Sequence, residues 1–239
     1  MEWSKFSSKF HESYHEIMQP FIESDACNEI YRFLKNESGR GALIAPQSIN
    51  TFRVFKEIAL KDIKAICLFQ DPYFTFKDKL PIANGIALDC SITQKQQPTL
   101  RQFFQGIEEE LYGGLSLQWN TEECDLSYLT EQGVMMLNAS LTVEKNKAGS
   151  HKQLWKPFTN YIIDKIVNRY NIPIVLLGKD AQEYEDVIDS IVLKTSHPAS
   201  ASYNGGKWNT NGIFTKLNEI IWNNEEEIVL WLPDIKVPF

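Results

Sequence analysis

Apolar residues follow two kinds of pattern along this chain. Four short runs rich in apolar residues predict strands, and the continuous run 66–69 is typical of a strand buried on both faces of a parallel sheet. These runs are residues 66–69, 134–137, 174–177 and 191–195. Between them, apolar residues recur every three or four positions, as in amphipathic helices. The alternation predicts an α/β fold, namely a three-layer α/β/α sandwich around a central four-stranded parallel sheet.

Two helix boundaries are indicated by particular residues. The stretch 3–34 carries an apolar stripe that Pro20 interrupts, so we expect the helix to break there. A later helix begins near Pro98, where Thr99 is a suitable N-cap residue. No internal repeat or low-complexity linker divides the chain, so we expect a single domain over residues 1–239.

Composition indicates a folded protein and its compartment, but it says little about the activity. The 239 residues are 43% hydrophobic, which suffices for a folded core, and the formal net charge of -7 still permits a local basic groove for nucleic acid. The four cysteines form no C-x-x-C pair, so zinc-ribbon and iron–sulfur sites lack their spacing. No signal peptide or membrane-spanning run is evident. We expect a cytoplasmic monomer with no metal, no other cofactor and no membrane partner.

Polar residues come directly after each predicted strand. Gln70-Asp71, Asn138, Gly178-Lys179 and His197 follow the four runs in order. Because the carboxyl ends of parallel strands open on one edge, we expect these side chains to converge where α/β sheets bind ligands. Taken singly, Asp71 is equally well a turn residue before a proline, and His197 a packed loop histidine. Their convergence favours a functional site.

One local motif suggests a different chemistry. Residues 11–15 (His-Glu-Ser-Tyr-His) fit the H-E-x-x-H pattern of zinc proteases, which requires both histidines on one face of a helix. A charged amphipathic helix matches five positions by chance, and no third ligand follows. We therefore disfavour a zinc site.

Several segments in order resemble the motifs of the family 1 uracil-DNA glycosylases. Residues 70–73 (Gln-Asp-Pro-Tyr) are similar to the water-activating loop, and residues 137–143 to the L-N-x-x-L-T-V segment. Residues 177–182 resemble the Gly-Ser loop, residues 196–200 (Ser-His-Pro-Ala-Ser) the intercalation loop, and residues 97–100 the proline-rich loop. Ordered matches over most of the chain are more specific than any single tetrapeptide.

The resemblance implies a DNA glycosylase with Asp71 and His197 as catalytic residues. Such enzymes extrude the target nucleotide, and cleavage develops positive charge on the sugar and negative charge on the base. Asp71 is expected to stabilise the sugar and to orient the attacking water. His197, as a neutral imidazole, is expected to donate a hydrogen bond to the base O2. No lysine stands in a motif position suited to Schiff-base chemistry, so we expect a monofunctional hydrolase.

The resemblance also assigns base and DNA contacts. Asn138 would pair with the pyrimidine edge, Tyr73 would exclude a methyl group at C5, and backbone amides near Gln70 would bind O2. Outside the family, Asn138 is a turn residue and Tyr73 a core aromatic. DNA contacts are expected from small or polar residues: Pro98, Thr99, Gly178, Lys179, Ser196, Ser200, Ala201 and Ser202. Three lysines are expected to add local positive charge: Lys147, Lys152 and Lys207.

Five positions depart from the family pattern: Phe69, Phe74, Leu88, Lys179 and Ala201. Leu88 stands where the family has the phenylalanine that stacks on uracil, and its lack of an aromatic face weakens stacking by about 1 kcal/mol. Ala201 replaces the intercalating leucine and is a poor wedge between bases. The candidates to take over that role are Tyr203, Asn204 and Trp208.

Three functions remain open at this point. The default is excision of uracil from double- or single-stranded DNA, as in base excision repair, which Tyr73 and Asn138 favour. The first alternative is excision of a modified cytosine, such as glucosylated hydroxymethylcytosine, from viral DNA in antiphage defence; Leu88 and Ala201 favour it. The second is a non-catalytic DNA-binding or replication-scaffold relative, which the presence of both Asp71 and His197 disfavours.

Overall fold

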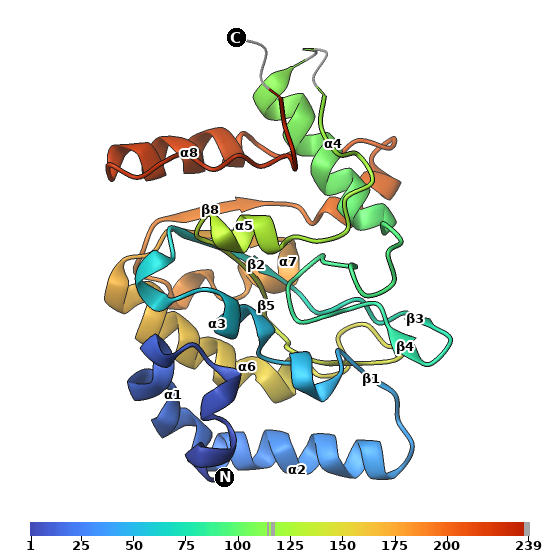
Figure 1. Ribbon diagram of the computed structural model, residues 1–239, viewed down its shortest axis with the longest axis vertical. Coiled ribbons are helices and arrows are strands. Elements are labelled where there is room, and N and C mark those ends of the chain that lie inside the picture. The colour runs from blue at the N-terminus through green and yellow to red at the C-terminus, as the bar shows by residue number, and fades with distance from the viewer. Residues whose placement is uncertain (114, 116–117, 237–239) are drawn as a thin grey trace.

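A four-stranded parallel sheet forms the centre of the computed structural model, which describes residues 1–113, 115 and 118–236 (Figure 1). The strand order is β5-β2-β7-β8. The strands are β2 (Ala65–Phe69), β5 (Val134–Asn138), β7 (Ile174–Leu177) and β8 (Val192–Thr195). The first three are buried along their whole length, whereas β8 at the sheet edge is only partly buried. The predicted sheet is therefore confirmed.

Helices cover both faces of this sheet. Figure 1 shows α4 and α8 on one side and α6, α1 and α2 on the other. The helices are α1 (His15–Ile22), α2 (Asp25–Gly39), α3 (Arg53–Glu57), α4 (Pro98–Tyr112), α5 (Ser127–Glu131), α6 (Lys152–Ile162), α7 (Lys179–Gln182) and α8 (Ile213–Asn223). A π-helical turn, Ile163–Asn168, extends α6. Short 3₁₀ turns are Trp3–Lys5, Ser7–Lys9, Glu12–Tyr14, Ser48–Asn50, Leu60–Asp62, Glu185–Val187 and Pro198–Tyr203.

Two small antiparallel pairs accompany the main sheet. Strand β1 (Ile44–Ala45) pairs with β6 (Val143–Glu144), and β3 (Phe76–Lys77) pairs with β4 (Leu80–Pro81). Both β3 and β4 lie in the segment that follows the end of β2. They therefore belong to the loops around the carboxyl edge of the sheet.

Aromatic side chains fill the two interfaces between helices and sheet. On one side, Phe103 of α4 stacks on Trp208 at 5.9 Å between ring centroids and meets Phe69 at the end of β2 at 6.3 Å. On the other side, Phe158 of α6 packs edge-on against Phe55 of α3 at 5.7 Å. Burial of each such ring contributes about 2–3 kcal/mol. Aromatic packing therefore lies on both faces of the sheet, and on the side of α4 it reaches the end of β2.

Two predicted helix boundaries are wrong. Pro20 lies inside α1, and the break comes later, at Ser24. The Ser24 hydroxyl accepts a hydrogen bond from the Cys27 amide at 3.2 Å and so caps α2. Thr99 is not the cap of α4, because Pro98 already occupies the first helical turn and Gln97 is the N-cap residue. Proline favours that first position, since its missing N–H has no helical partner there.

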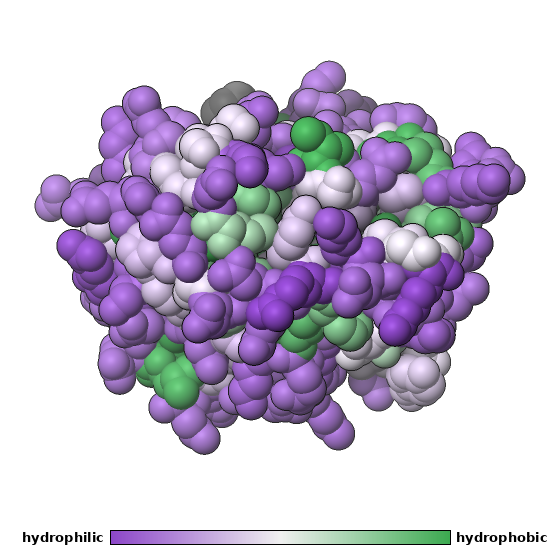
Figure 2. All heavy atoms as spheres, turned by 90° about the horizontal axis from the view of Figure 1, so that it is seen from below, coloured by the Kyte–Doolittle hydropathy of each residue, from purple (hydrophilic) through white to green (hydrophobic). Residues whose placement is uncertain are grey.

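One side of the molecule carries scattered apolar residues rather than a continuous apolar face (Figure 2). Figure 2 shows a side of the molecule that is mostly hydrophilic, with hydrophobic residues scattered among polar ones. Such scattered exposure is ordinary for a folded domain. No helix within the described residues is long and apolar enough to cross a bilayer.

Candidate active site

The strand register brings Gln70, Asp71 and Asn138 to one edge of the sheet. Phe69 at the end of β2 lies opposite Asn138 at the end of β5. The pairing continues beyond the strands, because the Ser140 amide donates to the Gln70 carbonyl at 2.9 Å. Asn138 is buried, whereas Gln70 and Asp71 are partly exposed. An amide and a carboxylate thus meet at the predicted carboxyl edge.

The Asp71 carboxylate is held by a backbone amide from a distant part of the chain. Gly149 N–H donates to Asp71 Oδ2 at 2.6 Å. Burial raises the pKa of Asp71, the nearby Asp180 carboxylate raises it further, and the Gly149 hydrogen bond opposes both. Oδ1 accepts no hydrogen bond from another described residue, so this oxygen is available to a water molecule or a ligand.

His197 is held in one tautomer. The Ala199 backbone N–H donates to Nδ1 at 3.2 Å, so in the neutral ring Nε2 carries the proton. Burial lowers the pKa of His197 to about 4, with the Asp180 charge opposing. The ring stands edge-on to Phe69 at 5.9 Å, which ties the end of β8 to the end of β2. His197 is therefore a neutral donor at the same edge as Asp71.

Leu88 lies in a strained segment beside β5. Its φ of 64° is in the left-handed region, which costs an ordinary side chain about 1 kcal/mol. The segment is fixed because Ala87 N–H donates to the Met136 carbonyl of β5 at 3.0 Å. The buried Asp89 carboxylate next to it accepts from the amides of Ser91 at 2.8 Å and Leu126 at 2.9 Å. These bonds place Leu88 close to the end of β5.

Tyr73 packs its ring against the core. Its hydroxyl oxygen is buried without a hydrogen-bond partner among the described residues, although it lies near the backbone amide of Leu100 in the first turn of α4. Burial raises the pKa of Tyr73 well above its usual range, so the hydroxyl is neutral. The ring packs against the core and lies near Asp89 and Cys90, which follow Leu88.

The predicted DNA-contact residues lie in three surface segments. Pro98 and Thr99 begin α4, and Lys179 begins α7. Ser196 precedes the turn Pro198–Tyr203, and Ser200 and Ser202 lie within it. Pro98, Lys179, Ser196 and Ser202 are exposed, Thr99 and Ser200 partly so, and Gly178 is buried against His197.

The turn Pro198–Tyr203 does not expose the residue that the family pattern singles out. Ala201 is fully buried, and the Trp208 ring is stacked on Phe103, so neither side chain is available as a wedge. Tyr203, in contrast, is 89% exposed. Of the three candidates to replace the intercalating leucine, Tyr203 and Asn204 are exposed, and Tyr203 is the aromatic one of these two.

The three lysines expected to add positive charge are each paired with a carboxylate. Lys147 pairs with Glu144 at 2.7 Å and Lys207 with Glu109 at 2.9 Å. Lys152 pairs with both Asp180 and Glu183 at 2.6 Å. Positive potential from these lysines is therefore partly neutralised. Lys179 has no ion pair with any residue that the structure describes.

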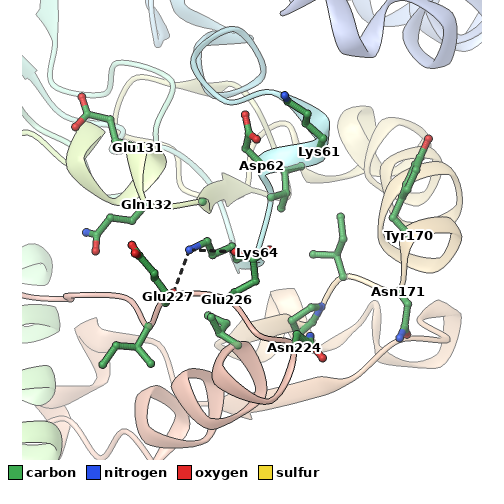
Figure 3. A pocket seen from close by; sticks show the side chains of 16 residues that line it. Lys61, Asp62, Lys64, Glu131, Gln132, Tyr170, Asn171, Asn224, Glu226 and Glu227 are labelled. Carbon is green, nitrogen blue, oxygen red and sulfur yellow. Dashed lines mark hydrogen bonds and ion pairs between the residues drawn. The ribbon is translucent and has the colours of Figure 1, made fainter.

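A polar cavity of about 480 Å³ lies at the opposite edge of the sheet (Figure 3). Its lining includes Lys64, Gly133 and Pro173, the residues directly before β2, β5 and β7. Lys64 Nζ donates to the Glu227 carbonyl at 3.0 Å and lies 3.6 Å from Glu226 (Figure 3). None of the predicted site residues lines this cavity, so it is separate from the candidate active site.

The H-E-x-x-H motif does not form a metal-binding helix face. His11 precedes a 3₁₀ turn and caps it through Nδ1, while His15 is the first residue of α1. His15 Nε2 lies 3.1 Å from the Ser7 carbonyl, and the ring stands against Trp3. The two imidazoles are therefore engaged in separate local contacts.

Sequence reasoning missed three residues that support this site. Gly149 binds Asp71, Asp89 fixes the Leu88 segment, and the Asp180 charge adds to the effect of burial on the pKa of Asp71 and opposes it on that of His197. Asp89 carried a signal, because an acid inside the apolar run Ala87-Leu88-Asp89-Cys90 is unusual. Gly149 and Asp180 carried no sequence signal beyond their place in the family motifs.

Comparisons with known proteins identify the family to which the chain belongs. The model of the "Uracil DNA glycosylase superfamily" matches residues 87–222. A uracil-DNA glycosylase of Francisella philomiragia is 32% identical over 97% of this chain and 99% of its own length, and one of Borrelia hermsii is 32% identical over 92% and 97%. The crystal structure of mimivirus uracil-DNA glycosylase shares the fold, with a TM-score of 0.82 at 19% identity over 93% of this chain and 87% of that one. The chain belongs to the uracil-DNA glycosylase superfamily.

Proposed function

We propose that this protein is a monofunctional DNA glycosylase that hydrolyses the N-glycosidic bond of deoxyuridine in DNA and leaves an abasic site. Full-length relatives named uracil-DNA glycosylase support the activity. The observation that carries the assignment is the pair of Asp71 and His197 at one sheet edge. One is a carboxylate with an open oxygen, and the other is a neutral imidazole with its proton on Nε2.

Asp71 acts on the sugar side of the bond. As the glycosidic bond breaks, its electron pair leaves with the base and the sugar gains positive charge. The Asp71 carboxylate stabilises that charge and orients a water molecule, whose oxygen bonds to C1′. One proton of this water is released, and the departing base takes up a proton at N1. Gly149 holds one carboxylate oxygen so that the other faces the reaction.

His197 acts on the base side. Negative charge that builds on the uracil O2 accepts a hydrogen bond from Nε2–H. Because the Ala199 amide donates to Nδ1, the tautomer with the proton on Nε2 is already present before the substrate binds. A preformed donor of this kind avoids reorganisation in the transition state.

Asn138 and Tyr73 select the base. The buried Asn138 amide accepts from N3–H and donates to O4 of uracil. Tyr73 lies against C5, where thymine has a methyl group. Its ring, packed against the core, also disfavours a bulky 5-substituted cytosine, because such a base requires the ring to move aside. The Leu88 side chain supplies apolar contact in place of aromatic stacking.

The substrate is DNA, and the contacts are proposed for Pro98, Thr99, Gly178, Lys179, Ser196, Ser200 and Ser202. Their small side chains and the exposed Lys179 suit close approach to phosphates. Tyr203 takes the place of the leucine wedge and enters the gap that the flipped nucleotide leaves.

The proposal is tested by abasic-site formation on matched oligonucleotides. Uracil, thymine, cytosine and hydroxymethylcytosine are placed in the same duplex and the same single strand. We expect cleavage of the uracil strands alone, and loss of this activity in Asp71→Asn. Intact uracil DNA together with cleavage of the modified-cytosine strand contradicts the proposal. Absence of turnover on every strand favours the non-catalytic alternative.

A further inference from the structure

We propose that Lys152 is a positioning residue: its ion pair with Asp180 locks the segment that holds Asp71 against the segment that holds His197. This inference rests on the proposed function, since it assigns Lys152 a role in the same reaction. The residues involved lie in three parts of the chain, at 71, 149–152 and 178–197. The ion pair joins the last two directly.

The first half of the connection runs from Asp71 to Lys152. Gly149 N–H donates to the Asp71 carboxylate at 2.6 Å. Lys152, the first residue of α6, donates its own backbone N–H to the Gly149 carbonyl at 3.1 Å. Any shift of the beginning of α6 therefore moves the donor that orients Asp71.

The second half runs from Asp180 to His197. Gly178, directly before α7, lies so close to His197 that an added Cβ would be 2.9 Å from the histidine Cβ. Gly178 N–H donates to the Thr195 carbonyl at 3.0 Å, and Gln182 Nε2 donates to the same oxygen at 2.8 Å. The short helix α7 is thus attached at both ends to the residues that lead into His197.

Lys152 joins the two halves at close range. Its Nζ lies 2.6 Å from Asp180 Oδ1 and 2.6 Å from Glu183 Oε1, and the three side chains are a quarter to a half exposed. Exposed pairs of this kind add only about 0–1 kcal/mol to stability. Their effect on the reaction is larger, because a displacement of about 1 Å in a catalytic group costs on the order of 100-fold in rate.

The competing explanation is that Lys152 contacts a DNA phosphate directly. A substitution of Asp180 distinguishes this explanation from a positioning role. If Lys152 binds phosphate, Asp180→Asn frees the ammonium group, tightens DNA binding and leaves the rate of cleavage unchanged. If Lys152 positions the two segments, Asp180→Asn lowers that rate as Lys152→Met does. The two explanations therefore predict opposite results for one variant.

The experiment measures single-turnover cleavage of a uracil oligonucleotide at saturating enzyme. We expect Lys152→Met and Asp180→Asn each to slow cleavage roughly tenfold, within the range that misplacement allows. The double variant is expected to be no slower than either single one, and Lys152→Arg to recover most of the rate. The matched control is Glu185→Gln, which breaks the Lys194–Glu185 pair at 2.7 Å on the same side of the sheet and leaves the rate unchanged.

A second measurement does not depend on turnover. The Gly149 amide proton reports the hydrogen bond to Asp71, and its NMR chemical shift is expected to move upfield in Lys152→Met and Asp180→Asn but not in Glu185→Gln. An unchanged shift in both variants, or a full cleavage rate in Asp180→Asn, overturns the inference. A wild-type protein that leaves uracil DNA intact while the Gly149 shift responds overturns the proposed function and retains the connection.

Discussion

The Ala199 backbone amide donates to Nδ1 of His197 at 3.2 Å, and this one bond decides what the ring can do. Burial lowers the pKa of His197 to about 4, with the Asp180 charge opposing, and protonation of Nδ1 would also break the hydrogen bond from Ala199. Near neutral pH, Nε2–H is therefore a fixed donor on an uncharged ring. A neutral donor of this kind can stabilise a developing anion without a bound counter-ion that must first be displaced.

The pH dependence of cleavage follows from these two groups. Asp71 works as a carboxylate, and burial raises its pKa, so the rate falls as pH drops through a value above the usual 3.9 or so. His197 has a pKa of about 4, so it stays neutral between about pH 6 and 8 and adds no transition to the rate there. Single-turnover rates are expected to show one acid limb from Asp71 at lower pH and a flat plateau between about pH 6 and 8. A limb centred near 6.5 contradicts the assignment of a neutral His197.

Gly178→Ala is expected to disable the site without unfolding the protein. The added Cβ would lie 2.9 Å from His197 Cβ, and the φ of 93° suits glycine alone. Displacement of the ring is expected to slow cleavage on the order of 100-fold. Gly212→Ala is the matched control: its φ of 72° costs about 1 kcal/mol of unfolding free energy, but the Cβ meets no neighbour and the rate is unchanged. Equal rates for the two variants contradict the prediction.

The sheet could be predicted because its strands are continuous apolar runs. β2, β5 and β7 occupy almost the predicted residues, and the polar residues after them converge as parallel strands require. The helix boundaries were less accurate because capping decided them. Ser24 caps α2, although Pro20 is the more obvious signal for a helix break. In α4, Pro98 occupies the first turn and Gln97, not Thr99, is the N-cap residue.

The supporting contacts of the site could not be predicted from local pattern. Gly149 reaches Asp71 across 78 residues, Leu126 reaches Asp89 across 37, and Lys152 reaches Asp180 across 28. Each depends on how loops meet after the sheet has formed. Periodicity and spacing describe only neighbours along one element, so they do not contain this information.

Tyr203→Ala is expected to impair cleavage in duplex DNA more than in single strands. The exposed ring is the proposed wedge for the gap that the flipped nucleotide leaves, and a single strand has no stacked gap to hold open. We expect a loss of roughly tenfold on duplex DNA, since stacking of one aromatic contributes about 1–3 kcal/mol. Tyr170→Ala serves as the control, because Tyr170 is also exposed but lines the cavity at the opposite edge of the sheet (Figure 3). Equal losses on both substrates contradict a wedge at Tyr203.

Leu88→Phe is expected to strengthen binding of the flipped base. The residue lies beside the end of β5, and an aromatic ring there adds stacking of about 1 kcal/mol, or roughly a fivefold lower KM for uracil DNA. The backbone strain at φ 64° is already present with leucine, so it does not distinguish the two side chains. Leu88→Met controls for a change of shape without an aromatic face and is expected to leave KM near the wild-type value. Denaturant unfolding of both variants separates a binding effect from overpacking, which lowers stability by about 1–3 kcal/mol. An unchanged KM in a fully stable Leu88→Phe protein shows that this side chain does not face the base.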